Sequence, residues 1–380
     1  MKKVFGWLRK ELMLTISVAA ALLSLFITPP SWELVSHIDW RTLATLFMML
    51  TVLEGFKKEN IFRPLLLLAG KIRSMVGLSL FLVFAVFFSS MFVTNDISLI
   101  IFVPLTIILF RAGDKERYIL PVITMENIAA VRGSLLTPFG SPQNLFIYGR
   151  SGVTAWHFVT YMLPIWVLSG ILLAGFVLFL YRKDFRQKTS LVKTDFAGVW
   201  HKEGQWRRIA YLMVFAVVLI VIISRTDHWL YAALVVAAAV FVIDKTIFLK
   251  TDYVLLLTFL CFFIFSSSIA ANEGIASFLS GAVANHEYLW GILLSQVISN
   301  VPAGIVLYPF AVNRGALLYG LDSAGLCTLI GSLASVINYR IYVREYPGKG
   351  GRFILVFTLI SLLFFAFMVV PGYFISQQPL

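Results

Sequence analysis

Long apolar runs separated by short polar segments dominate the chain. The runs are about 15 to 25 residues long and recur from residue 12 to residue 374. About 20 apolar residues in a helix cross a hydrocarbon core that is about 30 Å thick, whereas membrane strands alternate over about ten residues. The pattern therefore predicts an all-α polytopic membrane protein. We expect membrane helices over 11–28, 40–56, 118–149, 158–181, 209–224, 228–243, 251–270, 315–343 and 353–376.

Two further apolar regions, 74–110 and 286–313, carry polar residues near their centres. In the first, the tripeptide TND (94–96) is followed by the apolar run 97–110. As a helix, that run would be roughly 21 Å long, which is short of the core. The runs on either side of Asn300 are shorter still. We therefore predict that each region is a re-entrant helical hairpin whose polar tip lies inside the membrane.

The basic residues indicate the topology. The chain has 31 Lys and Arg residues and a net charge of +12. With a cytoplasmic N-terminus, almost all of them fall in cytoplasmic segments, as the positive-inside rule requires. This clustering beside membrane helices argues against nucleic acid as the partner. Both ends of the first hairpin then face the cytoplasm, and both ends of the second face outward. The basic residues outside the cytoplasmic segments are Arg41, Arg132, Arg150, Arg225 and Arg314.

Two motifs recur in the same order in each half of the chain. TNDISLIIFVPL (94–105) aligns with SNVPAGIVLYPF (299–310), and LLTPFGS (135–141) aligns with LCTLIGS (326–332). Each half also has the order helix, hairpin, broken helix, helix. The one extra helix between the halves reverses the orientation of the second half. The sequence thus predicts two inverted-topology repeats, which are typical of secondary transporters.

These motifs divide the chain into three parts. The first repeat covers 1–183, and the second covers 228–380. The part between them, 184–227, holds a basic cytoplasmic linker near the lipid headgroups and the extra helix. The hairpins lie at 74–110 and 286–313, and the broken helices at 118–149 and 315–343.

The polar groups of the hairpin tips can satisfy the backbone groups that the broken helices leave without partners. A broken helix leaves carbonyl and amide groups without partners, and lipid cannot satisfy them. Hydroxyls and amides at a hairpin tip can join freed carbonyls around a cation, and half-helix ends favour an anion. We therefore expect 94–96 to meet the break at 137–144. We expect 299–300 to meet the break at 328–335, near the bilayer midplane.

The motifs TND, LLTPFGSPQN, SNVP and GSLAS together resemble the ion transporter superfamily. That group includes citrate permeases, arsenite permeases and divalent anion–sodium symporters. The resemblance covers roughly residues 12–376. It implies a homodimer, an elevator-like movement of the part that bears the hairpins, and coupling to Na+ or H+ without another cofactor.

The resemblance also implies a set of site residues. Thr137 and Thr328 belong to the cation sites of the family, and substrate lies between the two tips. The cation-binding candidates are Thr94, Asn95, Asp96, Gly140, Asn144, Ser299, Asn300, Gly331 and Ser335. The substrate-binding candidates are Asn95, Asn300, Thr137, Thr328, Ser141, Ser332 and Arg132.

The tips differ from those of the dicarboxylate symporters, which carry Ser-Asn-Thr at both tips. Here the first tip is Thr-Asn-Asp, and Val301 and Pro302 follow Asn300 in the second. Both tips look closer to the arsenite-permease and citrate-permease branches. Val301 and Pro302 bring neither a hydroxyl nor a full set of backbone N–H groups to the second tip. Whether this tip binds a cation therefore stays open.

Ionisable groups within membrane segments are candidates for function. Asp96 is a candidate cation ligand or proton carrier, or an N-cap of the helix that follows it. Arg132 is a candidate for binding an anionic substrate, or for pairing with Asp96 or with Glu126 of a dimer partner. Glu126 and its neighbour Asn127 have a scaffold role as the alternative. Asp322 is a candidate for an external vestibule.

The sequence therefore predicts a secondary transporter of a small carboxylate or inorganic oxyanion, coupled to sodium or protons. Arsenite or antimonite efflux and sodium/proton antiport are the alternatives. We do not expect an enzyme, because no nucleophile with a base, metal cluster or nucleotide-binding loop is evident. The expected location is a prokaryotic cell membrane.

Overall fold

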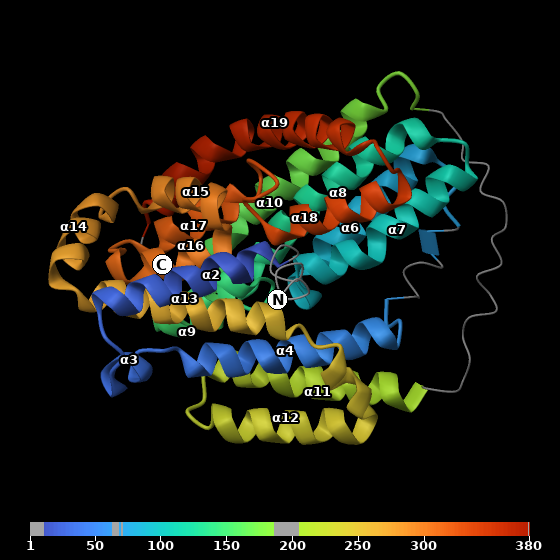
Figure 1. The fold of residues 1–380 in the computed structure, drawn as a ribbon. Helices are drawn as coiled ribbons and strands as arrows, with labels where there is room; N and C mark the ends of the chain where they lie inside the picture. Colours follow the sequence, from blue (N-terminus) through green and yellow to red (C-terminus); the bar gives the residue numbers. More distant parts are fainter. Residues whose placement is uncertain (1–10, 63–67, 70, 186–204, 379) are drawn as a thin grey trace.

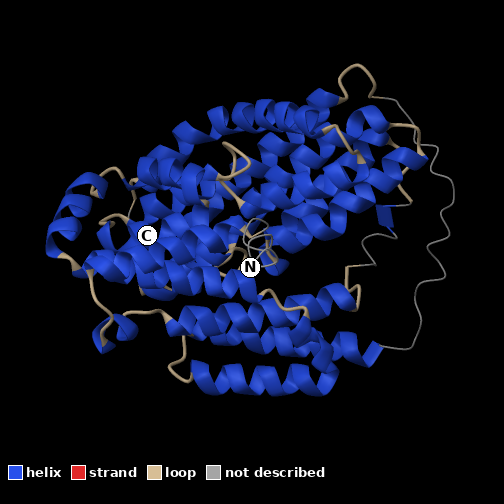
Figure 2. Cartoon of the chain, viewed as in Figure 1, coloured by secondary structure: helices blue, strands red, loops and turns tan. Residues whose placement is uncertain are grey.

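The computed structural model describes residues 11–62, 68–69, 71–185, 205–378 and 380. Figure 2 shows this part of the chain as helices joined by loops. Eight helical segments of the described residues, two of which join an α-helix to adjacent short helical turns, are long and apolar enough to cross a membrane, so the predicted all-α polytopic fold is confirmed. Most of the predicted linker, 186–204, lies outside the described residues.

The described helices fall into two sets along the chain. The first half contains α2 (Leu12–Ile27), α3 (Trp32–Ser36), α4 (Trp40–Lys58), α6 (Met75–Val93), α7 (Asn95–Ala112), η1 (Glu116–Tyr118), α8 (Ile119–Gly133), η2 (Ser134–Leu136), α9 (Pro142–Ser151) and α10 (Ala155–Leu180). The second contains α11 (Gln205–Ser224), α12 (Trp229–Asp244), η4 (Lys245–Leu249), α13 (Tyr253–Ala271), α14 (Glu273–Val283), α15 (Glu287–Ile298), α16 (Asn300–Leu307), η5 (Tyr308–Phe310), α17 (Arg314–Ala324), α18 (Leu333–Glu345) and α19 (Gly350–Ser376).

Helices α4, α11 and α12 pack together at one side of the molecule, at the bottom of Figure 1. Helix α4 begins at Trp40 because the carboxylate of Asp39 accepts a hydrogen bond from the Thr42 amide at 2.9 Å. Near its other end, Gly55 lies against the ring of Tyr211. A side chain at Gly55 would collide with that ring, so glycine permits the close approach of α4 and α11.

Helices α2 and α13 lie side by side next to this layer. The Ser268 hydroxyl donates to the Ser24 carbonyl at 2.7 Å, and Thr28 Oγ1 donates to the Ser268 carbonyl at 2.9 Å. These bonds join the last turns of both helices, so the two helices run parallel. Hydroxyl groups serve well here because they satisfy backbone carbonyls without an exposed polar surface.

Helices α6 to α10 and α15 to α19 form the body that holds the hairpins. Helix α6 packs on α7 and α8, and α15 packs on α16 and α17. The second helix of each hairpin also packs against the broken helix of the opposite half, α7 against α18 and α16 against α9. The broken helices cross in the same way, with α8 against α18 and α17 against α9. Each half thus contributes the same set of contacts to the centre of this body.

The structure differs from the sequence prediction at the first hairpin and in short helices that were not predicted, such as α3 and α14. Helices α6 and α7 have 19 and 18 residues and are long enough to span a membrane, so the argument from a short arm fails for the first hairpin. The helix starts at Asn95 and continues through Pro104 to Ala112. In contrast, α15 and α16 have 12 and 8 residues. Helix α14 was not predicted; its N-cap Asn272 accepts from the Ile275 amide at 3.1 Å.

Candidate functional site

A single residue separates the two helices at each hairpin tip. Thr94 has φ 70° and ψ 158°, and Ser299 has φ 71° and ψ 159°. These angles belong to a region that glycine adopts readily and other residues enter at a cost of about 1–3 kcal/mol. Because neither residue is a glycine, each tip carries backbone strain that a glycine there would avoid. The two tips therefore share one strained conformation, although they lie in different halves of the chain.

The first broken helix is interrupted at 137–141, which we call the first break. The Gly140 amide donates to the Thr137 carbonyl at 3.3 Å and closes a tight turn. A Cβ atom on Gly140 would lie 2.0 Å from the Ser134 carbonyl oxygen, so only glycine fits there. Asn144 Nδ2 donates to the carbonyls of Leu135 and Thr137 at 3.2 and 3.3 Å. This amide replaces part of the hydrogen bonding that the break removes.

The second broken helix is interrupted at 325–332, the second break, with the same turn. The Gly331 amide donates to the Thr328 carbonyl at 3.2 Å, and a Cβ atom on Gly331 would lie 2.2 Å from the Ala324 carbonyl oxygen. Here the amide that satisfies the broken helix comes from the hairpin. Gln296 Nε2 donates to the Ala324 carbonyl at 3.2 Å, and Gln296 Oε1 accepts from Thr328 at 2.7 Å.

Each hairpin contacts the break of its own half. In the first half, the Thr137 hydroxyl donates to the carbonyl of Met91, in the last turn of α6 before the tip. The rings of Phe92 and Phe139 lie 6.4 Å apart between their centres. In the second half, Gln296 makes the corresponding contact from α15. No hydrogen bond of the described residues joins Asn95 directly to Asn300.

The two broken helices are joined to one another by buried polar side chains. Gln143 Nε2, two residues after the first break, donates to the Asp322 carboxylate at 2.9 Å. Asn127 Nδ2 donates to the Ser335 hydroxyl at 3.0 Å. Asn338 Nδ2 donates to the carbonyl of Ile123 at 2.7 Å. The arm after each break is thus held to the arm before the other break.

Arg132 is fully enclosed at this crossing, with 1% of its surface exposed. Its Nε donates to the Ser169 hydroxyl at 3.0 Å, and a terminal nitrogen lies 3.4 Å from the Asp322 carbonyl. The Asp322 carboxylate is close enough to attract it. Arg132 therefore pairs with neither Asp96 nor Glu126, which corrects both of these expectations.

Glu126 has no exposed surface and accepts a hydrogen bond from Thr106 of α7. A carboxylate enclosed in this way cannot reach a dimer partner. Asp322 is also buried, with 2% exposure, and so lies inside the body and not in an open vestibule. Asp96 lies in the first turn of α7, where the N-cap position belongs to Thr94, so the N-cap interpretation of Asp96 is wrong.

Several buried oxygen atoms around the tips and breaks have no hydrogen-bond partner among the described residues. They belong to Asp96, Glu126, Asn127, Gln143, Asn144, Asp322 and Asn338. Buried acceptors nearly always have a donor or an ion beside them. Carboxylate and amide oxygens are the kinds of ligand that a hard cation such as sodium prefers, and a buried carboxylate can also take up a proton.

The residues predicted for the sites differ in how far they are exposed. The buried ones are Asn95, Thr137, Gly140, Ser141, Asn144, Ser299, Asn300, Gly331, Ser332 and Ser335. Thr94 and Asp96 are partly exposed, whereas Thr328 is exposed. Asp252, at the start of α13, is close enough to repel the Asp96 carboxylate.

Sequence reasoning missed Gln143 and Gln296, whose partners are distant in the chain. Gln143 stands within the motif SPQN, between the predicted site residues Ser141 and Asn144. An amide side chain in the first turn after a helix break is a signal that could have identified it, because the broken backbone needs donors and acceptors there.

The chain is similar to proteins of known families. The citrate transporter family model matches residues 3–317. Inner membrane protein YbiR of Escherichia coli is 31% identical over 332 residues, covering 84% of each chain. Uncharacterized transporter MJ0456 of Methanocaldococcus jannaschii is 28% identical over 353 residues, covering 92% of this chain and 94% of its own.

Proposed function

Because the chain belongs to the citrate transporter family and is therefore a membrane transporter, we propose that it carries a small carboxylate or inorganic oxyanion together with sodium ions or protons. The observation that carries this proposal is the pair of strained tips, Thr94 and Ser299, each beside a break with the same glycine turn. Freed backbone groups at matched breaks are the means by which secondary transporters bind ions and substrate inside a membrane.

We propose that the first cation site lies between 94–96 and the first break. One buried oxygen of Asp96, beside the tip, and one of Asn144, beside the break, have no partner among the described residues. Thr137 is held beside the tip by its bond to Met91. The substrate site would lie at the crossing of the broken helices, where the amide groups that start α9 and α18 favour negative charge.

The exchange of partners between the halves supports an inverted repeat, because each hairpin packs against the broken helix of the opposite half. We further propose an elevator-like movement of this body against the layer of α4, α11 and α12, in a homodimer of a prokaryotic membrane with a cytoplasmic N-terminus. Figure 1 separates the layer from the body that holds both hairpins.

Arg132 favours a second candidate, the efflux of arsenite or antimonite. Its guanidinium is engaged by Ser169 and by the Asp322 backbone, so it offers little to an anion. Arsenite is a neutral acid near pH 7 and needs no cationic group. Sodium/proton antiport through Asp96 has the same support from unpartnered oxygens but leaves the second tip unexplained.

Thermal unfolding of the purified protein separates these functions. A ligand that binds only the folded state adds RT ln(1 + [L]/Kd) to stability, or about 2.7 kcal/mol at 100 times Kd. The protein is measured in sodium, potassium and lithium salts, each with citrate, succinate, sulfate, phosphate or arsenite. We expect one anion to stabilise the protein more in sodium or at lower pH, and Asn300→Ala to abolish that effect. Stabilisation by arsenite alone would favour the second candidate.

A further inference from the structure

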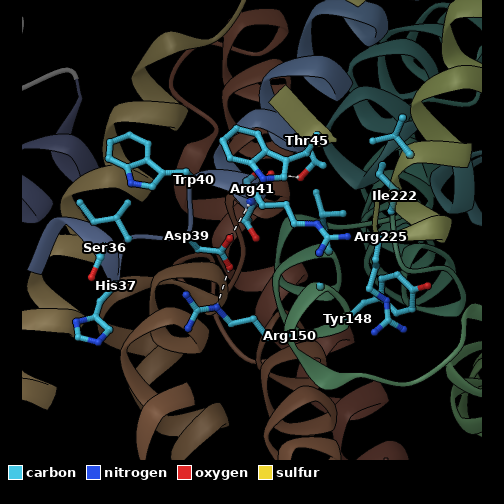
Figure 3. Close-up of a pocket in the computed structure, with 16 residues that line it drawn as sticks. Ser36, His37, Asp39, Trp40, Arg41, Thr45, Tyr148, Arg150, Ile222 and Arg225 are labelled. Atoms are coloured by element: carbon cyan, nitrogen blue, oxygen red, sulfur yellow. Dashed lines mark hydrogen bonds and ion pairs between the residues drawn. The ribbon is translucent and has the colours of Figure 1, made fainter. Parts of the chain in front are cut away.

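Three arginines meet at one cavity at the end of α9 that is remote from the first break. The cavity has a volume of about 480 Å³, and its wall contains Arg41 of α4, Arg150 of α9 and Arg225 from the loop after α11. Figure 3 shows Arg41 extending between the Asp39–Arg150 pair and Arg225. None of the lining residues belongs to a tip or a break. This volume lies within the range of about 300–1,000 Å³ that small-molecule sites occupy.

The positive charge of the cavity is not neutralised by its walls. Asp39 is the one carboxylate among the described lining residues. Its Oδ2 accepts from Arg150 Nε at 2.8 Å, and its Oδ1 accepts from the Thr42 amide at 2.9 Å. Each carboxylate oxygen thus already accepts a hydrogen bond from a donor other than Arg41 and Arg225. Three guanidinium groups against one carboxylate leave two positive charges in excess.

Of the other two arginines, Arg225 is held against an aromatic ring, and Arg41 has a donor without a partner among the described residues. The Arg225 guanidinium stacks on the ring of Tyr148 at 4.3 Å, and Tyr148 Oη donates to the Ile223 carbonyl at 3.0 Å. Arg41 has a buried terminal nitrogen with no hydrogen-bond partner among the described residues. A buried, charged donor without an acceptor is costly, and an oxyanion would satisfy it.

We propose that this cavity is a second anion site, which binds a carboxylate or phosphate oxyanion carrying at least two negative charges. Guanidinium groups suit such anions because their N–H groups match two oxygens at once. On the topology proposed above, the site opens on the external face. It joins α9, which begins at the first break, to α4 and α11, so a bound anion links the hairpin body to the neighbouring layer.

The anion has two possible sources, a solute or an anionic lipid headgroup. Trp40 and Trp229 line the cavity, and tryptophan is frequent where a membrane meets water. Inorganic phosphate titrated into protein in neutral detergent tests the soluble source. Nanodiscs of phosphatidylglycerol, compared with nanodiscs of phosphatidylcholine, test the lipid source. Thermal unfolding of the full-length protein is measured in both arms.

We expect phosphate or phosphatidylglycerol to stabilise the wild-type protein, and Arg41→Gln to weaken the apparent affinity by about tenfold to a hundredfold. Arg41→Lys keeps the charge and should weaken the apparent affinity less than Arg41→Gln does. It replaces Arg41→Gln in the test if that variant folds poorly. Asp39→Asn should tighten binding severalfold, since asparagine still caps α4. Arg314→Gln is the matched control, because Arg314 is exposed against Tyr308 and does not line the cavity.

Stabilisation that depends on Arg41 only in the nanodisc arm would keep the site and assign it to lipid. Equal affinities for wild type, Arg41→Gln and Arg225→Gln in both arms would overturn the proposal. Asn300→Ala should retain this stabilisation even if it abolishes the effect of the transported anion. The experiments therefore distinguish a failure of the proposal for the second anion site from a failure of the proposed transport function.

Discussion

Replacing Gly140 by alanine tests whether the tight turn at the first break is needed. The added Cβ would lie 2.0 Å from the Ser134 carbonyl oxygen and 2.8 Å from its carbonyl carbon. Both atoms belong to the backbone, so they cannot move aside as a side-chain tip can. Relief to ordinary contact requires a displacement of more than about 1 Å, and overpacking of this kind costs about 1–3 kcal/mol.

The displacement would also disturb the carbonyl groups that lie next to the Asn144 side chain. Asn144 Nδ2 lies 3.5 Å from the Ser134 carbonyl, next to the two carbonyls that it bonds more closely. Moving Ser134 therefore changes the shape of the break as well as its stability. We expect Gly140→Ala to lower the midpoint of thermal unfolding and to reduce substrate uptake into proteoliposomes by at least about tenfold.

Gly175→Ala is the matched control. Gly175 lies in α10, and a Cβ there would meet nothing within 4 Å. Alanine in an open helical position stabilises by about 0.5–1 kcal/mol. The control should therefore unfold at the same or a higher temperature and transport normally. Equal stability and equal uptake of the two variants would refute the argument that only glycine fits at the first break.

Three other changes test the remaining parts of the site. Asp96→Asn should change the dependence of uptake on sodium and pH while the protein stays folded; an unaltered ion profile would remove Asp96 from coupling. Gln143→Met leaves the buried Asp322 carboxylate without its donor and should lower stability by about 1–3 kcal/mol in thermal unfolding, whereas no change would show that another donor serves. Asn300→Cys should react with a water-soluble thiol reagent and be protected by substrate; an inaccessible thiol in every condition would contradict a binding role for the second tip.

The positions of the tips and breaks could be predicted because each depends on local chemistry. Thr94 and Ser299 lie where polar residues interrupt apolar runs, and the structure interrupts the helices at those residues. Gly140 and Gly331 lie in turns that the shared threonine, glycine and serine pattern marked. A break inside an apolar run leaves a clear signal, because few residues there are polar.

Long-range partners could not be predicted in the same way. Gln143 and Asp322 are 179 residues apart, and their contact depends on how two broken helices cross. The enclosure of Arg132 depends on Ser169 of α10, which no motif indicates. The sequence prediction makes α7 too short because it places Asn95 and Asp96 in a tip outside the helix, whereas both lie in its first turn.

The amides of Asn144 and Gln296 have a consequence for the timing of a transport cycle. A carrier that releases its cargo must reset to the starting side unloaded, and unsatisfied carbonyls within the membrane would raise the energy of that step. Here Asn144 already bonds the carbonyls of Leu135 and Thr137, and Gln296 bonds that of Ala324. Side chains of the protein itself thus support the backbone at both interruptions, so in the transport cycle proposed above the reset would not depend on a bound ligand to satisfy these carbonyls.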